Sequence, residues 1–146
     1  MTRIPDEESL QAERACQRLV LRYADLIDAG FAGRVAELFD REAVWESGPR
    51  RWVGIQEIRR GFAGREALPR VSAHLCGPTL FTLLSPNQAQ GVTSYLLFRA
   101  RPARRDGAAQ PSEWRLAGFY DDAFVRVDGE WLFAHRRAVV TFSDPA

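Results

Sequence analysis

The sequence predicts one α+β domain spanning residues 1–146, in which about three N-terminal helices pack on a curved, mostly antiparallel sheet. Two observations predict this class. Apolar residues recur at helical spacing in the N-terminal part, and four long segments with strand-like alternation follow Pro69. Helices followed by a run of strands are typical of α+β proteins. We expect the sheet to bend around the helices into a cone that encloses a pocket.

The helices are predicted from apolar periodicity and capping residues. The first lies between an N-cap at Asp6 or Ser9 and a stop at Gly30. Its apolar face consists of Cys16, Leu19, Val20, Tyr23, Leu26 and Ile27. A second, short helix has an apolar side made of Phe31, Val35, Leu38 and Phe39. The third carries Ile55, Ile58 and Phe62 and is closed by Gly64 and Pro69.

Strands are predicted where apolar residues alternate between turn signals. Two short strands, 43–46 and 51–53, flank the turn at 47–49. Four long strands follow, at 71–84, 90–101, 114–127 and 131–142. The pair Asp128-Gly129 predicts a two-residue hairpin between the last two, because both residues tolerate positive φ.

Basic residues are unusual here, since all 20 are arginine and only two histidines, His74 and His135, are present. The lack of lysine excludes Schiff-base chemistry, and two histidines exclude a three-histidine zinc site. Proton transfer near neutral pH therefore falls on an imidazole, or on a carboxylate or tyrosine with a shifted pKa. We expect no metal and no organic cofactor.

The net charge is +1, so composition does not indicate binding to nucleic acid or to an anionic membrane. Arginine pairs recur at 50–51, 59–60, 104–105 and 136–137, with acidic residues interleaved. We favour solvated surface or ion pairing for these pairs, with phosphate binding as the alternative.

The chain shows no sign of export or membrane insertion. No secretory signal precedes the first helix, and no apolar run reaches the length of a membrane span. Cys16 and Cys76 match no metal or redox spacing. We expect a cytoplasmic protein with reduced thiols.

Tyr23 and Asp28 lie near the end of the first predicted helix, about 140° apart on a straight helix. Fraying of the last turn would let Asp28 turn toward the space that Tyr23 faces. An acid this close to a helix C-terminus is disfavoured by the dipole, so a functional role is one interpretation, although the residues alone favour a cap. The alternative is that Asp28 caps the loop into Phe31.

His74 opens the first long strand and shares a face with Cys76. A histidine that merely satisfies its ring nitrogens at a strand end is the simpler interpretation, and general acid–base chemistry is the other. Cys76 lies roughly 6.6 Å along the strand, at about 3.3 Å per residue, which is too far for a nucleophile–base hydrogen bond.

Aromatic and polar residues on the predicted strands could line the pocket. Strand alternation puts His135 on a face with Trp131 and Phe133, which suits packing or substrate contact, and Arg136 on the other face. We interpret the adjacent acids Asp121 and Asp122 as an edge or ion-pair feature rather than an acid–base pair. Each aromatic position could equally belong to the core. The residues predicted to bind substrate are Trp45, Tyr95, Tyr120, Phe124 and His135.

The order of these parts resembles the SnoaL-like branch of the nuclear transport factor 2-like superfamily. The resemblance is carried by residues 22–28, 35–39, 43–45, 54–59, 72–75, 118–126, 128–131 and 135–137. It covers about residues 10–142. The resemblance implies a cone-shaped fold, but it says little about the reaction, because this scaffold hosts many chemistries.

Several dehydratase-like members of that branch use an Asp–His dyad at the positions of Asp28 and His74, with a tyrosine matching Tyr23. The resemblance thus implies catalytic Tyr23, Asp28 and His74 in a dehydratase, isomerase or cyclase acting on an apolar, cyclic substrate. It also implies a homodimer or homotrimer. The alternative is a non-catalytic role, as a subunit like the β subunit of a ring-hydroxylating dioxygenase or as a small-molecule binding module.

Overall fold

The computed structural model describes residues 4–102 and 106–145 and has the predicted α+β architecture. Arg104 and Arg105, one of the arginine pairs, lie outside the described residues. The helical elements are α1 (Glu7–Asp28), the 3-10 helix η1 (Ala32–Leu38) and α2 (Ile55–Glu66). The strands are β1 (Phe39–Ser47), β2 (Arg50–Val53), β3 (Val71–Ser85), β4 (Gln88–Ala100), β5 (Trp114–Val127) and β6 (Glu130–Ser143).

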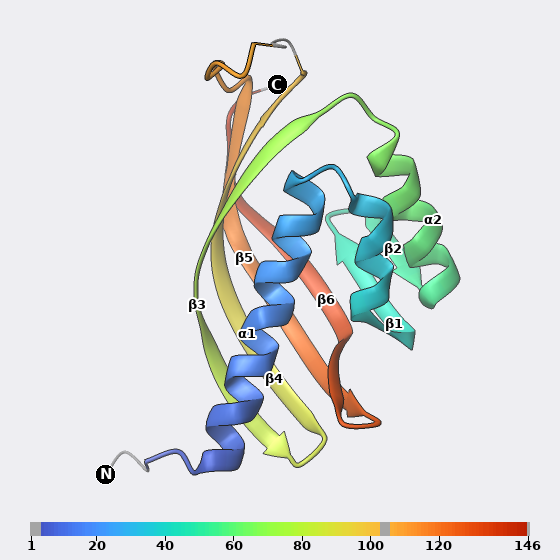
Figure 1. Cartoon of the computed structure of the whole chain (residues 1–146), viewed down its shortest axis with the longest axis vertical. Helices are drawn as coiled ribbons and strands as arrows, with labels where there is room; N and C mark the ends of the chain where they lie inside the picture. The colour runs from blue at the N-terminus through green and yellow to red at the C-terminus, as the bar shows by residue number, and fades with distance from the viewer. Residues whose placement is uncertain (1–3, 103–105, 146) are drawn as a thin grey trace.

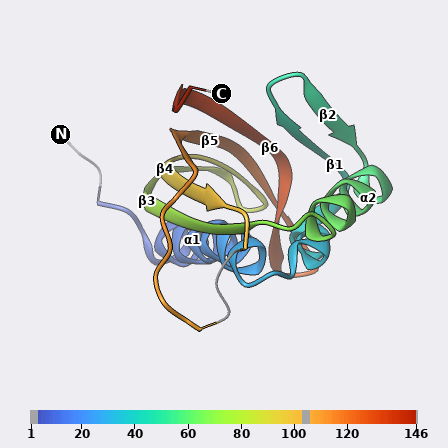
Figure 2. The ribbon, with the colours of Figure 1, turned by 90° about the horizontal axis from the view of Figure 1, so that it is seen from above.

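All six strands form one sheet in the order β2-β1-β6-β5-β4-β3. Every neighbouring pair is antiparallel except β1 and β6, which run parallel. The sheet curves around α1, while η1 and α2 lie beside the shorter strands (Figure 1). Seen from the end where β3 begins, α1 lies within that curve (Figure 2). This arrangement is the predicted cone.

The boundaries of α1 follow from its capping residues. Asp6 is the N-cap, and its side chain accepts a hydrogen bond from the backbone N–H of Ser9. At the other end Gly30 has φ of +88°, and the N–H of Phe31 bonds the carbonyl of Leu26. A residue with positive φ stops the helix, as the sequence predicted.

The hairpin between β5 and β6 has the predicted turn. Asp128 and Gly129 have φ values of +51° and +81°, and Val127 pairs with Glu130 across them. Positive φ at both central positions is the geometry that matches the twist of the strands.

Several predicted element boundaries differ from those of the structure, most of them by one or two residues. β1 begins at Phe39, which was assigned to the second helix, and α2 continues past Gly64 to Glu66. β4 begins at Gln88, two residues earlier than expected. No helix among residues 4–102 and 106–145 is long and apolar enough to cross a membrane.

The core lies between α1 and the concave face of the sheet. Its centre is aromatic, because Tyr23 from α1 makes ring contacts with Phe62 of α2, Tyr120 of β5 and Phe133 of β6. Ring centroids are 5.7–6.2 Å apart in these three pairs, and all are tilted edge to face. Such pairs add to the stabilisation from buried area. The helix that carries Tyr23 is thereby fixed against the sheet.

Candidate active site

The last residue of α1 contacts the first part of β3. Asp28 Oδ1 lies 2.7 Å from His74 Nδ1, and Asp28 Oδ2 accepts the backbone N–H of His74 at 2.7 Å. The hydroxyl of Ser72 donates to Asp28 Oδ1, also at 2.7 Å. Three hydrogen bonds from one strand therefore fix the carboxylate, and the alternative that Asp28 caps the loop into Phe31 is wrong.

Fraying of α1 is not needed for this contact. Asp28 is still helical, and the helix ends after it. The two strand residues reach the carboxylate instead, because β3 passes the end of α1 with Ser72 and His74 on its inner face. The expectation of a frayed last turn was wrong for this reason.

The contact between Asp28 and His74 is shielded from solvent on the histidine side. The side chain of His74 is 2% exposed and that of Asp28 is 25% exposed. Burial alone would raise the pKa of Asp28, but hydrogen bonds from the ring and backbone of His74 and from Ser72 lower it below its ordinary value. An ionised Asp28 holds the proton of His74 on Nδ1, which leaves Nε2 able to accept a proton.

His74 lines a cavity of about 210 Å³ between α1, α2 and the sheet. Tyr23, Trp45, Tyr95 and Tyr120 line it too, so three of the five residues predicted to bind substrate lie on its wall. Asp28 does not line it and reaches it only through His74. A wider hollow of about 710 Å³ lies outside α1, next to the β5–β6 hairpin, and neither histidine lines it.

Tyr23 is oriented by a second aromatic residue of the cavity wall. Its hydroxyl oxygen accepts a hydrogen bond from Trp45 Nε1 at 3.0 Å, and its side chain is buried. Because the oxygen accepts from Trp45, the phenolic proton is free to point elsewhere. No acceptor for that proton lies among the described residues. Tyr23 can therefore donate a hydrogen bond to a ligand in the cavity.

Tyr95 and Tyr120 form a stacked pair on the same wall, with ring centroids 4.4 Å apart. Burial raises the pKa of Tyr95, and it raises that of Tyr120 well above the ordinary value. Both phenols are therefore neutral at physiological pH. The wall that they form is flat, aromatic and uncharged.

A buried ion pair, whose basic partner the sequence did not identify, lies behind Tyr120 and Tyr23. Arg136 donates from Nε and Nη2 to the two oxygens of Asp122, each at 2.8 Å, and both side chains are 0% exposed. Burial disfavours the cation, but Asp122 raises the pKa of Arg136 above its ordinary value. Burial raises the pKa of Asp122, and the charge and hydrogen bonds of Arg136 oppose this increase. Because Arg136 donates to both carboxylate oxygens, we interpret the pair as ionised.

The guanidinium of Arg136 lies over three aromatic rings. Its central carbon is 3.8 Å from the ring centroid of Tyr120 and 4.3 Å from those of Tyr23 and Phe133. Arg136 thus supplies positive charge behind two residues of the cavity wall without lining the cavity itself. The adjacent pair Asp121 and Arg137 forms an exposed ion pair at 3.0 Å, so the ion-pair interpretation of both acids is confirmed.

Two predicted substrate-binding residues, Phe124 and His135, lie away from the cavity. Phe124 faces inward but is buried deeper in the core, against Phe133. His135 faces outward because a β-bulge interrupts β6: Phe124 pairs with Phe133, whereas Ala123 pairs with His135. The extra residue shifts the alternation, so Phe133 and Arg136 both face inward.

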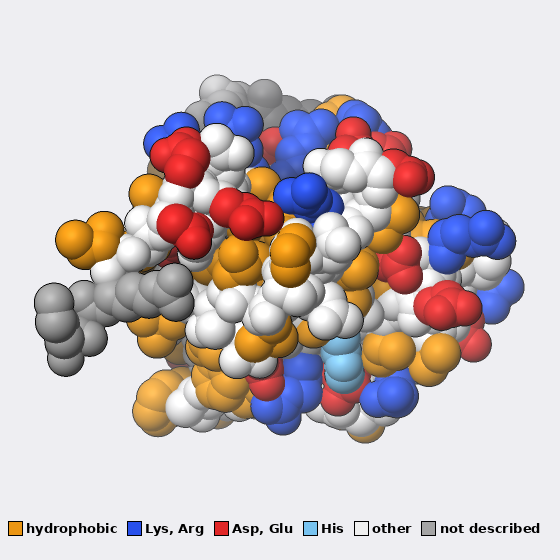
Figure 3. Space-filling view, turned by 90° about the horizontal axis from the view of Figure 1, so that it is seen from below, with side chains coloured by type: hydrophobic (Ala, Val, Ile, Leu, Met, Phe, Trp, Pro, Cys, Tyr) orange, Lys and Arg blue, Asp and Glu red, His pale blue; other side chains and the backbone are white. Residues whose placement is uncertain are grey.

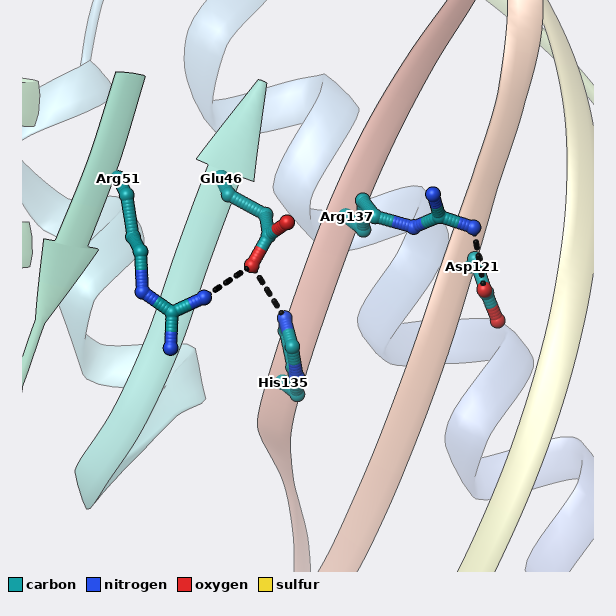
Figure 4. A network of polar contacts seen from close by, with 5 residues as sticks. All are labelled: Glu46, Arg51, Asp121, His135 and Arg137. Atoms are coloured by element: carbon teal, nitrogen blue, oxygen red, sulfur yellow. Dashed lines mark hydrogen bonds and ion pairs between the residues drawn. The ribbon is translucent and has the colours of Figure 1, made fainter. Parts of the chain in front are cut away.

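Figure 4 shows His135 on the face of the sheet opposite α1. Its Nε2 atom lies 2.9 Å from Glu46 Oε2, and Arg51 donates to the same oxygen at 2.7 Å. The side chain of His135 is 42% exposed. This surface network accounts for the histidine without a role in the cavity.

Four arginines of the cavity wall were also missed as a group. They are Arg50, Arg65, Arg70 and Arg99. The arginine pair at 50–51 was the only sequence signal for any of them, and it favoured solvated surface. Among the described residues, no group of three or more His, Cys, Asp or Glu side chains could hold a metal ion.

Comparison with protein families finds a match over residues 8–137 to the model described as a SnoaL-like domain. The chain belongs to the SnoaL-like family. A comparison with curated proteins finds no match. The resemblance read from the sequence motifs is therefore confirmed at the level of family.

Solved structures with the same fold as this SnoaL-like domain are distant in sequence. A proposed scytalone dehydratase from Novosphingobium aromaticivorans is 21% identical with a TM-score of 0.82, over 96% of this chain and 91% of that one. A hexachlorocyclohexane dehydrochlorinase, LinA type 2, is 20% identical with a TM-score of 0.79. The match covers 97% of this chain and 93% of that one.

The β subunit of a proposed aromatic-ring-hydroxylating dioxygenase from Novosphingobium aromaticivorans has the same fold and a comparably low sequence identity. It is 18% identical with a TM-score of 0.77, over 96% of this chain and 95% of that one. These likenesses establish the nuclear transport factor 2-like fold and leave the activity open.

Proposed function

We propose that this SnoaL-like protein is a cofactor-independent lyase or isomerase that uses His74 as its general base. The observation that carries the proposal is the 2.7 Å contact of Asp28 Oδ1 with Nδ1 of His74, a residue that lines the cavity. A carboxylate on one ring nitrogen fixes the tautomer that leaves the other nitrogen free to accept a proton, and it stabilises the imidazolium that forms.

In the proposed reaction, His74 Nε2 removes a proton from a carbon next to a carbonyl group. The electron pair of the C–H bond forms a C=C bond, the π pair of the carbonyl moves to its oxygen, and Tyr23 donates a hydrogen bond to that developing oxyanion. The imidazolium then returns the proton. Protonation of a departing hydroxyl group completes a dehydration, and protonation of a different carbon completes an isomerisation.

The cavity supports a small cyclic substrate. Its volume of about 210 Å³ lies below the roughly 300–1,000 Å³ of pockets for drug-sized ligands. The stacked rings of Tyr95 and Tyr120 offer a flat surface against which a ring can pack. We therefore favour a monocyclic or bicyclic skeleton over a steroid.

Exchange of α-protons for deuterium tests this proposal without knowledge of the natural substrate. The protein is incubated in D2O with a panel of cyclic ketones, some neutral and some carrying a carboxylate, and exchange is followed by NMR. General-base catalysis contributes about 10²–10⁴-fold, so His74→Ala should lose that factor. Asp28→Asn should lose much of it, because the amide can fix the wrong tautomer.

Circular dichroism and the melting temperature show whether each variant is folded. Catalysed exchange that persists in folded His74→Ala would refute the proposal. No catalysed exchange from any ketone in the wild-type protein would instead favour the alternative of a non-catalytic subunit or binding module.

We also propose that the protein forms a homodimer or homotrimer through the outer face of its sheet. Large apolar side chains are exposed on the convex side of β3 and β4, and two of them, Leu80 and Leu84, are 79% and 57% exposed. Leu75, Val92 and Leu96 lie on the same side. Light scattering after gel filtration tests this, and Leu80→Glu should then shift the mass toward the monomer.

A further inference from the structure

The cavity has an excess of positive charge that the general-base mechanism does not use. Arg50, Arg65, Arg70 and Arg99 line it, and no Asp or Glu does. In the part of the chain that the structure describes, none of the four forms an ion pair. Glu66, next to Arg65 in the sequence, accepts instead from the backbone N–H of Gly33 at 2.6 Å.

Elsewhere on the molecule charges of opposite sign are mixed. On the face shown in Figure 3, acidic and basic side chains lie among one another. Arg34, Arg51, Arg115 and Arg137 all pair with acids. The cavity wall differs from that face, because its four arginines have no Asp or Glu among them.

Arg99 is the member nearest to the dyad in the sheet. On β4 it pairs with Ser72 of β3, and Leu97, two residues earlier, pairs with His74. Arg99 thus lies on the inner face of the sheet, two residues along β4 from the position opposite His74. Its Nε atom is buried and has no hydrogen-bond partner among the described residues. A buried donor without a partner is rare in folded proteins, so it marks a place for an acceptor.

Two other arginines converge on Arg99. The guanidinium of Arg70 lies 5.9 Å from the ring centroid of Trp114, which pairs with Arg99 across β4 and β5. Arg65, Arg70 and Arg99 also line one small hollow beside Ser72, which adjoins the cavity. Glu66 lines this hollow too, but its carboxylate accepts from the backbone N–H of Gly33 and forms no ion pair among the described residues. Helix α2, the loop before β3, and β4 therefore each contribute an arginine at one end of the cavity.

This convergence of like charges is unfavourable by itself. Burial, with Arg65 and Arg70 close by, lowers the pKa of Arg99 to about 10. The pKa of Arg70 is lowered by burial and by Arg65 and Arg50. Like charges that are partly removed from water repel one another, and a bound anion relieves this repulsion.

We infer that the substrate is an anion whose carboxylate or phosphate group is bound by Arg99 together with Arg65 and Arg70. This inference rests on the proposed function for the identity of the bound molecule as substrate. Guanidinium groups bind both oxyanions through paired N–H donors, so both share the chemistry. The ring of the substrate would pack on Tyr95 and Tyr120 and place its acidic carbon at His74. The expected apolar substrate thus becomes an amphipathic one.

Binding of simple ligands tests the inference independently of turnover. Isothermal titration calorimetry compares benzoate and phenyl phosphate with neutral benzamide, which has a similar shape, and with inorganic phosphate. We expect the two aromatic anions to bind at least about tenfold more tightly than benzamide, with an affinity that falls as salt rises. The better of the two identifies the anion, and phosphate alone tests whether the ring contributes.

Variants identify the residues that bind the anion. Arg99→Gln should lower the affinity for benzoate or phenyl phosphate at least about tenfold and leave the affinity for benzamide unchanged. It should also melt no lower than the wild type, because repulsion is removed. Arg59→Gln is the matched control, since Arg59 lies on the same helix as Arg65 but bonds only the exposed Gln56 and does not line the cavity.

The outcomes separate this inference from the proposed function. His74→Ala should bind the anions normally even though it loses α-proton exchange. If benzamide binds as well as benzoate, or if Arg99→Gln binds anions as tightly as the wild type, the inference is wrong even when exchange depends on His74. If anion binding depends on Arg99 but His74→Ala still catalyses exchange, the anion site is confirmed and the proposed function is refuted.

Discussion

His74 Nδ1 lies 2.7 Å from Asp28 Oδ1, although 46 residues separate the two in the chain. The contact joins the last residue of α1 to the beginning of β3. It is held by two further hydrogen bonds to the same carboxylate, from the backbone of His74 and the hydroxyl of Ser72. The carboxylate is therefore part of the packing between helix and sheet as well as of the proposed mechanism.

Asp28 should stabilise the fold only where it is ionised. Its pKa is lower in the folded protein than its ordinary value, so the folded state releases this proton more readily than the unfolded state. The stabilisation is then complete above the unfolded pKa, about 3.9, and is lost as pH falls through the folded pKa. Urea unfolding should show wild type more stable than Asp28→Asn at pH 7, with the gap shrinking below about pH 4. An equal gap at both pH values would contradict this.

Arg136→Met should destabilise the protein strongly, because it leaves the buried carboxylate of Asp122 without its partner. Removal of one member of a buried ion pair costs about 3–5 kcal/mol. Urea unfolding measures the loss, and the double variant Arg136→Met/Asp122→Leu should recover much of it. Arg137→Gln is the control, since its pair with Asp121 is about half exposed and such pairs contribute about 0.2–1 kcal/mol.

Tyr23→Phe should slow α-proton exchange by about 10²–10³-fold, the usual effect of removing one donor to an oxyanion. The fold should persist, because the ring contacts remain. Trp45→Phe should have a smaller effect in the same direction, since it removes the donor that orients the Tyr23 hydroxyl. The exchange rates of both variants test this, and an unchanged rate in Tyr23→Phe would remove that hydroxyl from the mechanism.

Cys16 should be inert toward thiol reagents in the folded protein. Burial, with a contribution from Asp122, raises its pKa to about 12, and its side chain is fully buried. Since the thiolate is the reactive form, a chromogenic disulfide at pH 8 should not label Cys16 in a Cys76→Ser background. Addition of urea should release one thiol per chain. Rapid labelling without denaturant would show that α1 opens readily.

His135→Ala should leave both ligand binding and α-proton exchange unchanged. The histidine lies on the convex face, and within residues 4–102 and 106–145 its side chain has one hydrogen-bond partner, Glu46, which also accepts from Arg51. Loss of such a half-exposed pair changes the free energy of unfolding by about 0–1 kcal/mol. Calorimetry with benzoate and the exchange assay check this. A tenfold loss in either would mean that the sequence prediction of a substrate contact was right after all.

Local signals in the sequence determined most of the fold. Asp6 and Gly30 bounded the first helix, and Asp128-Gly129 fixed the last hairpin, because caps and turns depend on a few adjacent residues. Tyr95 and Tyr120, predicted as strand residues that line a pocket, lie on the cavity wall. The family resemblance singled out Asp28 and His74, whose contact the structure contains and whose catalytic roles stay predictions.

Only the tertiary structure decided how the strands align and which charges meet. One extra residue in β6 turned His135 outward and Arg136 inward, and a bulge of this kind leaves no mark in a period-two pattern. The ion pair of Arg136 with Asp122, and the convergence of Arg65, Arg70 and Arg99, join side chains from different elements. Their positions depend on long-range packing, which composition and spacing do not encode.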